Sequence, residues 1–284
     1  MNILLCGEDS FAAKGLLEKL EESNFNVDCF SKGKESRGGK YITGDVFAMS
    51  KNPYFLDSYD IVISYILIKN KTVEENITFV KELDNFCEQK NVKRLIQISS
   101  ISVYPNELKY VNEKTEIESN CDNKGEYASV KIAVDQFLLH KTSTYPVTFI
   151  RPGYLVCEDN NFSYAGIGIC LPLRLILLLG NKKTSLPLIQ RDKMNESLVE
   201  IIKKNRFNDV YLFLENKKGT KYQFLKSRVT RKIIPLPKSI ILFCARIAKT
   251  LKLLSDKQYH QIKGLFKETY FDSSESEKEL QITF

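Results

Sequence analysis

Short β-rich apolar runs alternate with longer segments of helical periodicity through the first 151 residues, and this alternation limits the fold more than any other feature. Parallel strands need a long crossover, which a helix usually supplies with a right-handed path. The order of elements therefore predicts an α/β fold of the Rossmann type, with a doubly wound parallel sheet. Strands are expected at residues 2–6, 25–30, 61–68, 94–98 and 147–150, and helices after Gly7 and at residues 74–89 and 127–139.

After Arg151 the alternation becomes irregular, and glycine, proline and asparagine cluster between mixed helices and short strands. We therefore expect a Rossmann domain over residues 1–155, and a small mixed α/β portion over residues 156–284 that is interleaved with it. Residues 237–254 follow a helical pattern with interspersed basic side chains. We expect this helix to pack beneath the C-terminal portion, with contact to a membrane surface as the alternative. The polar segment 273–279 is expected to have few fixed contacts.

A strand that ends in glycine and leads into a helix is where the pyrophosphate of a dinucleotide rests on backbone N–H groups. In this chain the turn begins at Gly7, and small residues follow at Ser10 and Ala13. Small side chains permit close approach of the backbone to phosphate and of the helix to the strand. We therefore assign Gly7, Ser10 and Phe11 to a cofactor site. An ordinary βα turn is the alternative, because two acidic residues lie in the same loop.

Hydroxyl side chains follow the predicted strand 94–98, at the carboxyl end where such sheets bind ligands. Further along, Tyr127 and Lys131 stand four residues apart on one face of a predicted helix. Hydride transfer at a carbon that bears oxygen needs a group that moves a proton at that oxygen. Tyrosine does this when a nearby cation stabilises its phenolate, and a hydroxyl such as that of Ser100 orients the substrate oxygen. Ser100, Tyr127 and Lys131 are therefore the predicted catalytic residues.

This ordered set of motifs resembles the extended short-chain dehydrogenase/reductases, the NAD-dependent epimerase/dehydratase family of nucleotide-sugar enzymes, along nearly the whole chain. The resemblance implies catalytic roles for Ser100, Tyr127 and Lys131, and a terminal helix over residues 271–280. The chain departs from the family in its glycine-poor loop and in residues 188–193. The correspondence further rests on Gly7, Ser10 and Ala13, on Gly44 with Asp45, on the strand 60–65, on Asn76, and on Arg151, Pro152 and Gly153.

Cofactor contacts follow from the same resemblance and from the end of the second strand. An acidic residue there would bind the ribose 2′-OH of NAD. Here the position is Ser31, and basic residues follow it, which suits a 2′-phosphate and favours NADP over NAD. A solvated loop rich in lysine is the alternative. The cofactor-binding residues predicted in addition to the glycine turn are Ser31, Lys32, Arg37, Asp45, Val46, Ser64, Tyr65, Tyr127, Lys131 and Pro152.

The expected substrate is a nucleotide-linked sugar, with contacts predicted at Ser102, Tyr104, Asn161 and Arg191 in or near the C-terminal portion. A reductase exchanges its cofactor in every cycle, whereas a non-redox epimerase retains it, so NADP-like features favour a reductase of a 4-keto sugar in polysaccharide or glycan precursor synthesis. A C4 epimerase of the UDP-hexose type with the same three catalytic residues is the first alternative. A catalytically silent NAD(P)-binding regulator is the second.

Composition excludes several other classes of protein. The seven cysteines are odd in number and widely spaced, and there are only two histidines, so we expect a reducing, cytoplasmic environment and no metal site. The longest apolar run, 167–179, contains Pro172 and Arg174 and is shorter than the ~20 residues that span a bilayer; no signal peptide or transmembrane segment is expected. The net charge of +7 is scattered, so no nucleic-acid partner is expected. The sequence leaves the oligomeric state open, including a homodimer.

Overall fold

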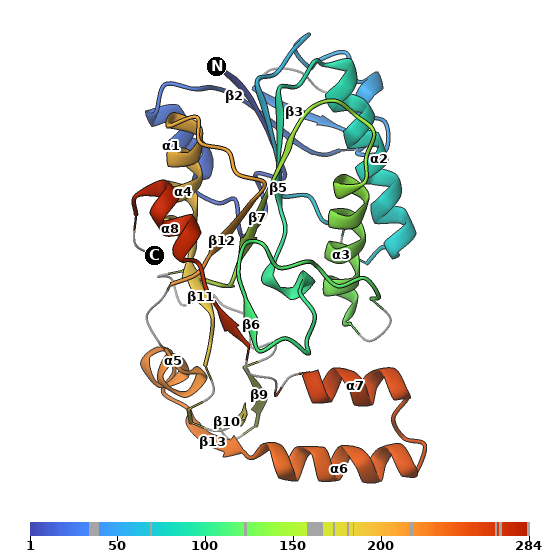
Figure 1. Ribbon diagram of the computed structural model, residues 1–284, viewed down its shortest axis with the longest axis vertical. Helices are drawn as coiled ribbons and strands as arrows, with labels where there is room; N and C mark the ends of the chain where they lie inside the picture. The colour runs from blue at the N-terminus through green and yellow to red at the C-terminus, as the bar shows by residue number, and fades with distance from the viewer. Residues whose placement is uncertain are drawn as a thin grey trace.

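A seven-stranded parallel sheet lies between two layers of helices in the computed structural model, which confirms the expected Rossmann-type fold (Figure 1). The strand order is β12-β7-β5-β4-β1-β2-β3. The structure describes residues 1–33, 40–68, 70–121, 124–157, 167–172, 174–180, 182–183, 185–215, 219–264, 266 and 269–282. The strands are β1 (Asn2–Cys6), β2 (Asn26–Lys32), β3 (Tyr41–Gly44), β4 (Ile61–Ser64), β5 (Arg94–Ile98), β7 (Val147–Pro152) and β12 (Val210–Phe213).

Helices cover both faces of the sheet, which explains why its inner strands β1, β4 and β5 bury side chains on both faces. In β1, Ile3 and Leu5 face one core, and Leu4 and Cys6 face the other. The first core lies under α1, α4 and α8, and the second under α2 and α3, as Figure 1 shows on opposite sides of the sheet. These helices are α1 (Leu16–Glu22), α2 (Val73–Gln89), α3 (Glu126–Leu139), α4 (Arg191–Lys203) and α8 (Ser274–Leu280).

The chain leaves the sheet earlier than predicted after β4, which ends at Ser64 and not at Ile68. The reason lies in α2, where the Asn76 side chain accepts a hydrogen bond from the Ile68 N–H at 3.0 Å and donates to the Ile68 carbonyl at 3.2 Å. A side chain thus satisfies backbone groups that a longer strand would pair with a neighbour. Thr72 and Glu75 form a capping box that fixes the start of α2 at the predicted place.

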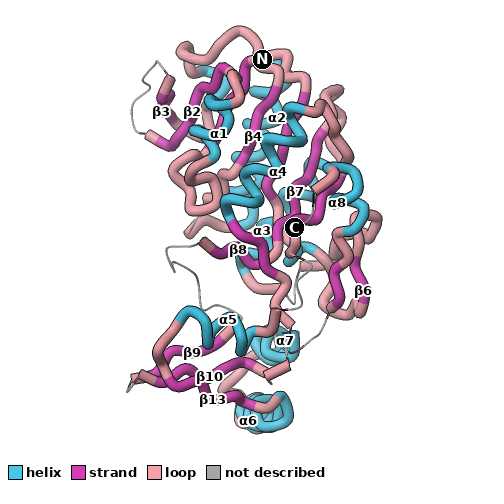
Figure 2. Tube along the Cα trace, turned by 90° about the vertical axis from the view of Figure 1, so that its left-hand side faces the viewer, coloured by secondary structure: helices cyan, strands magenta, loops and turns pink. Residues whose placement is uncertain are grey.

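The C-terminal half contributes β12 to the main sheet between two stretches of chain that build a second lobe. Glycine is required at position 153, because a Cβ there would lie 2.5 Å from Leu214 Cδ2 and 2.6 Å from the Pro187 carbonyl oxygen. The second lobe lies below the main sheet in Figure 2 and contains the small sheet β13-β10-β9 with α5 and α6. The remaining elements are η1 (Met49–Lys51), η2 (Ile101–Val103), β6 (Tyr110–Val111), β8 (Tyr154–Val156), β9 (Gly168–Leu171), β10 (Leu175–Leu179), β11 (Leu188–Gln190), α5 (Lys221–Arg228), β13 (Lys232–Leu236), α6 (Lys238–Thr250), α7 (Asp256–Gly264) and β14 (Tyr270–Phe271).

One expectation for the C-terminal half is wrong, and a second holds only in part. The basic helix α6 lies along the edge of the lobe, but it packs there through one narrow face, since Ala245 is its one buried residue. The polar segment 273–279 has fixed contacts, since it forms most of α8 and its Ser273 and Ser276 are buried. The Ser276 hydroxyl donates to Glu113 at 2.6 Å and accepts from the Leu212 N–H at 2.9 Å. A polar helix can therefore be anchored by specific hydrogen bonds where its composition offers few apolar contacts.

Candidate active site

The carboxyl ends of β1, β4 and β5 are adjacent in the sheet, so the glycine turn and the hydroxyl-rich segment meet at one edge. Gly7 follows β1, Ser64 ends β4, and Ser99 and Ser100 follow β5. Both Ser64 and the next residue, Tyr65, are buried. This is the edge at which open parallel sheets bind ligands.

Ser100 and Tyr127, two of the predicted catalytic residues, are in contact in the structure. The phenol of Tyr127 forms a hydrogen bond with Ser100, whose hydroxyl also accepts from the Ser102 N–H at 3.1 Å. Half of the Tyr127 side chain is exposed at the surface, where a substrate can approach it. Loss of water around the hydroxyl raises the pKa of Tyr127, and the hydrogen bond with Ser100 lowers it by a smaller amount. The tyrosine is therefore protonated at neutral pH, as a proton donor must be.

Lys131 lies one helical turn further along α3 and is buried. Its Nζ donates a hydrogen bond of 2.6 Å to the carbonyl oxygen of Ile98, the last residue of β5. Burial lowers the pKa of Lys131 to about 8, while the carboxylate of Asp135 acts in the opposite direction. The ammonium thus exchanges its proton close to neutral pH, in contrast to an exposed lysine.

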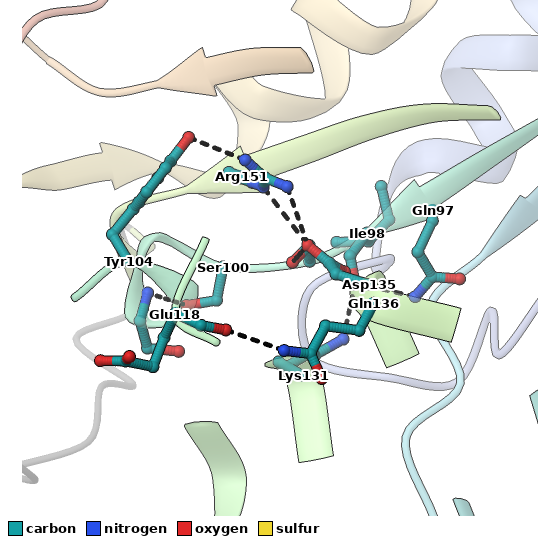
Figure 3. A network of polar contacts seen from close by, with 11 residues as sticks. Gln97, Ile98, Ser100, Tyr104, Glu118, Lys131, Asp135, Gln136 and Arg151 are labelled. Atoms are coloured by element: carbon teal, nitrogen blue, oxygen red, sulfur yellow. Dashed lines mark hydrogen bonds and ion pairs between the residues drawn. The ribbon is translucent and has the colours of Figure 1, made fainter. Parts of the chain in front are cut away.

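A buried ion pair lies behind these residues (Figure 3). Asp135 Oδ2 accepts from Arg151 Nη2 at 3.1 Å and from the Ser99 hydroxyl at 2.8 Å, and Arg151 Nη1 donates to the Tyr104 hydroxyl at 2.9 Å. Asp135 is fully buried and Arg151 is 2% exposed. Since Tyr127, Lys131 and Asp135 are spaced at four-residue intervals on α3, the ion pair fixes the face of the helix that presents the tyrosine.

The sequence interpretation missed the part played by Asp135, although its position four residues after Lys131 was a visible signal. It also placed Tyr104 at the substrate, whereas the structure places this residue in the core with its hydroxyl on Arg151. Ser102 is half-buried, and its hydroxyl has no hydrogen-bond partner. A substrate contact is thus available to Ser102, while Tyr104 belongs to the support of the site.

The glycine turn adopts a left-handed conformation at Gly7, where φ is 82°. A Cβ at this position would lie 3.2 Å from Ile66 Cγ1, so a larger residue would be strained in both conformation and space. The Ser10 hydroxyl accepts from the Ala13 N–H at 3.3 Å and so occupies one donor of the turn. Regular helix begins only at Leu16, which leaves a longer turn than the sequence predicts before α1.

Arg191 lies at this turn, far in sequence from the residues it meets. Its guanidinium carbon is 5.5 Å from the centre of the exposed Phe11 ring. Nε and Nη1 of Arg191 are buried and have no hydrogen-bond partner, although Asp192 Oδ1 is 3.7 Å from Nε. A buried guanidinium with unused donors is costly unless an anion binds it. The structure therefore places Arg191 at the glycine turn, whereas the sequence interpretation had assigned it only to substrate binding.

The predicted adenosine side of the cofactor site lies at the ends of β2 and β3. Ser31 and Lys32 close β2 and pair with the last two residues of β3, next to the exposed Asp45. The Asp45 carboxylate accepts from the Phe47 N–H at 2.9 Å, and Val46 is buried. Arg37 and the predicted substrate residue Asn161 lie outside the described residues. Pro152, which ends β7, is buried.

A dinucleotide fits this edge of the sheet by the chemistry of its lining. Buried polar atoms without a hydrogen-bond partner are infrequent in folded proteins and need an explanation. Several occur along the carboxyl edge of the strands, where a ligand with phosphate and hydroxyl groups would satisfy them. They belong to Ser64, Tyr65, Ser102 and Arg191.

Comparison with protein families gives one match. Residues 3–165 match the NAD dependent epimerase/dehydratase family, which is more than half of the chain. The matched range contains the glycine turn, Ser100, Tyr127 and Lys131. No curated protein sequence matches the chain significantly.

Solved structures resemble the chain over almost its full length at low identity. UDP-glucuronic acid 4-epimerase from Bacillus cereus, solved with UDP-glucuronic acid and NAD, is 16% identical with a TM-score of 0.69, over 100% of this chain and 94% of that one. Human epimerase family protein SDR39U1, solved with NADPH, is 14% identical with a TM-score of 0.64, over 98% and 93%. The NDP-hexosamine 5,6-dehydratase TunA is 12% identical with a TM-score of 0.68, over 99% and 92%. At these identities the likeness shows the fold alone.

Proposed function

The chain belongs to the NAD dependent epimerase/dehydratase family, and from this membership we propose that it reduces the 4-keto group of a nucleotide-linked sugar. A nicotinamide cofactor is common to the family. When bound, it supplies the hydride for the carbonyl carbon. The residues of this chain then have to hold the two ligands and deliver a proton to the carbonyl oxygen.

The observation that carries the proposal is the protonated phenol of Tyr127 in contact with Ser100. Ser100 orients the carbonyl oxygen by a hydrogen bond, and Tyr127 donates its proton to that oxygen as negative charge develops there. General acid catalysis of this kind contributes typically ~10²–10⁴-fold to the rate. Lys131 stabilises the phenolate that forms, and its pKa of about 8 lets it return a proton at neutral pH. Asp135 and Arg151 are positioning residues, because they act through Lys131 and α3.

We assign the cofactor phosphates to the glycine turn and to Arg191, whose buried Nε and Nη1 have no hydrogen-bond partner. The contact with Arg191 compensates for the small number of glycines in the turn. It also compensates for the N–H group of Ala13, which already donates to the Ser10 hydroxyl. Isothermal titration of Arg191→Gln with NADP and with NAD tests the assignment. Both affinities should fall by about tenfold or more, since a charge-assisted phosphate contact is lost. An unchanged affinity for both cofactors would show that Arg191 does not bind the cofactor phosphates. The earlier assignment of Arg191 to the substrate would then stand.

At the adenosine end, the proposed selectivity is for NADP. Ser31 and Lys32 lie at the end of β2, where a carboxylate would favour the free ribose of NAD. Asp28, the acidic residue of this strand, accepts a hydrogen bond of 2.7 Å from the Tyr59 hydroxyl. Asp28 is therefore held by a contact within the packing of the sheet and is not available to bind the ribose.

The substrate is assigned to the C-terminal portion, residues 156–284, together with Ser102. A nucleotide sugar is the class that the similar Bacillus cereus epimerase binds, since that structure holds UDP-glucuronic acid. The same likeness favours one alternative reaction, C4 epimerisation, in which the hydride returns to the same sugar. Both reactions use Ser100, Tyr127 and Lys131, but in epimerisation Tyr127 would first accept the proton of the C4 hydroxyl and then return it, whereas in the reduction it only donates a proton.

Identification of the copurifying nucleotide, followed by assays on UDP-, dTDP- and GDP-linked 4-keto sugars, tests the proposal. Stoichiometric consumption of exchangeable NADPH is expected for the reductase. Tightly held NAD with interconversion of two hexose epimers and no net oxidation would establish the epimerase. Turnover of neither class of substrate by a protein that binds cofactor would overturn both.

A further inference from the structure

Acidic residues are missing from the two stretches of sequence that contain the described elements β9, β10, α5, β13 and α6 of the second lobe. Residues 160–190 and 216–255 contain 14 lysines and arginines and no aspartate or glutamate. The rest of the chain therefore has 28 basic and 35 acidic residues, a formal charge of −7 against +14 in these segments. The modest net charge of the whole chain conceals this separation. A surface of one sign attracts a partner of the opposite sign over a distance comparable with the Debye length.

An exposed apolar stripe runs along α6 in the same lobe. Ile240, Phe243, Ile247 and Leu251 recur at three- and four-residue spacing and so share one face of the helix and its end. They are 52%, 64%, 45% and 63% exposed, and Leu253 just beyond is 73% exposed. Most large apolar side chains of soluble proteins are covered, and a contiguous exposed set marks an interaction surface.

The opposite side of α6 accounts for its attachment to the lobe. Ala245 is buried, and its helical neighbours Ile241 and Ala248 are partly covered. Lys249 Nζ forms an ion pair of 2.5 Å with Asp256 at the start of α7. Figure 1 shows α6 at the outer edge of the lobe, with α7 alongside it on the inner side. The apolar stripe is thus on a helix at the periphery of the molecule and is not needed to hold that helix in place.

Basic side chains occupy the other faces of the same helix. Lys238, Arg246 and Lys252 are exposed on α6 and immediately after it. A helix with an exposed apolar stripe, whose own charged residues are all basic, fits an anionic lipid surface, in which acyl chains cover the apolar groups and headgroups meet the charges. A nucleic acid would leave the apolar groups in water. A second copy of the chain would bring two strongly basic lobes together, which charge repulsion opposes.

From this arrangement we propose that α6 docks the protein on the surface of a membrane that contains anionic lipids. The helix has 13 residues, or about 20 Å at 1.5 Å per residue, and lies in the plane of the interface. Among the described residues, no helix is long and apolar enough to cross a bilayer. This inference does not depend on the reaction proposed above, because it rests on the exposed surface of α6 and not on Ser100, Tyr127 or Lys131.

Vesicle flotation of the full chain tests the docking. The probes are phosphatidylcholine vesicles with and without a minority of phosphatidylglycerol. We expect the partition coefficient to be at least about tenfold higher with the anionic lipid, and to fall as salt is raised. The variant Phe243→Gln/Ile247→Gln/Leu251→Gln should lose at least about tenfold on anionic vesicles, since it removes the apolar anchor and keeps a helix-forming residue at each site.

Two further variants separate apolar from electrostatic contributions. Lys238→Gln/Arg246→Gln/Lys252→Gln should lose the preference for phosphatidylglycerol and most of the salt dependence. The matched control Tyr54→Gln/Leu56→Gln/Leu139→Gln removes three exposed apolar side chains elsewhere, 49%, 37% and 49% exposed, and should bind vesicles like the wild type. Circular dichroism and cofactor affinity confirm that each variant is folded.

Three results would overturn the proposal. The first is a wild-type protein that does not bind anionic vesicles, or whose binding the α6 triple variant leaves unchanged. The second is a wild-type protein that binds a random-sequence RNA but not vesicles. The third is a concentration-dependent dimer, seen by sedimentation velocity, that the triple variant abolishes while vesicle binding persists.

Discussion

The ion pair behind the active site is a sensitive point of the fold, and Arg151→Met tests it. Methionine keeps an unbranched apolar side chain, shorter than that of arginine, and carries neither the charge nor the hydrogen-bond donors. In the wild type, Arg151 donates to Asp135 Oδ2 from Nη2 at 3.1 Å and from Nε at 3.3 Å, and to the Tyr104 hydroxyl at 2.9 Å. After the substitution, Asp135 is left with the Ser99 hydroxyl and the buried charge of Lys131.

The expected loss follows from burial. Removing one partner of a buried ion pair costs about 3–5 kcal/mol, because the other charge stays in the interior without compensation. Since Lys131 still faces Asp135, we expect the lower end, about 3 kcal/mol. In a chain of this size, each kcal/mol lowers Tm by roughly 2–4 °C. The Tm of Arg151→Met should therefore fall by roughly 6–12 °C.

The loss should also depend on pH. Burial raises the pKa of Asp135, and Arg151 lowers it, so removal of Arg151 moves the folded-state pKa further above the ordinary value. A carboxyl group with a raised folded-state pKa binds protons more readily in the folded than in the unfolded protein. The stability of Arg151→Met relative to the wild type should therefore recover as pH falls through that pKa toward 3.8, the ordinary value for aspartate.

Thermal unfolding followed by circular dichroism from neutral pH to about pH 4.5 measures both effects. Lys19→Met is the matched control, because it breaks an exposed pair with Glu196 and should cost only ~0–1 kcal/mol. The double variant Arg151→Met/Asp135→Leu should recover part of the loss, since neither charge is then buried alone. A Tm within about 2 °C of the wild type, or a double variant no more stable than Arg151→Met, would refute the reasoning.

Three further predictions concern the catalytic and cofactor residues. Tyr127→Phe deletes only the proton donor and should lower kcat by ~10²–10⁴-fold, with Tm and cofactor affinity nearly unchanged. Ser100→Ala should lower kcat by a smaller factor. Wild-type turnover of Tyr127→Phe on an authentic substrate would contradict the assigned mechanism. The folded-state pKa of Lys131 is about 8, below its ordinary value of 10.5. The buried ammonium therefore destabilises the folded protein most below pH 8, and this destabilisation decreases as pH rises toward 10.5. Without cofactor, wild-type stability by urea unfolding should therefore rise by about 2 kcal/mol relative to Lys131→Met between pH 7 and 9.5, and parallel curves would contradict this pKa. Lys32→Glu should weaken NADP about tenfold by charge repulsion and affect NAD less in calorimetric titration; equal effects on both would show that the end of β2 does not contact the 2′-phosphate.

Local patterns were sufficient for the elements that build the main sheet. The predicted strand 2–6 and the helix that ends at Gln89 agree with β1 and α2, because a continuous apolar run and a Thr72–Glu75 capping box act over a few residues. The spacing of Tyr127 and Lys131 determined that they share a helix face, and the order of strands determined that this face meets Ser100. These features follow from backbone geometry and depend little on distant contacts.

Tertiary packing decided which residues support the site. The pairing of Asp135 with Arg151, and the position of Arg191 over Phe11, join segments whose distance depends on how α3, β7, α1 and α4 pack on the sheet. The same limit applies to α6, whose sequence shows an apolar face but not whether anything covers it. Periodicity specifies the faces of an element, whereas burial is a property of the whole fold, and so the charges and apolar groups left without a neighbour emerged only from the structure.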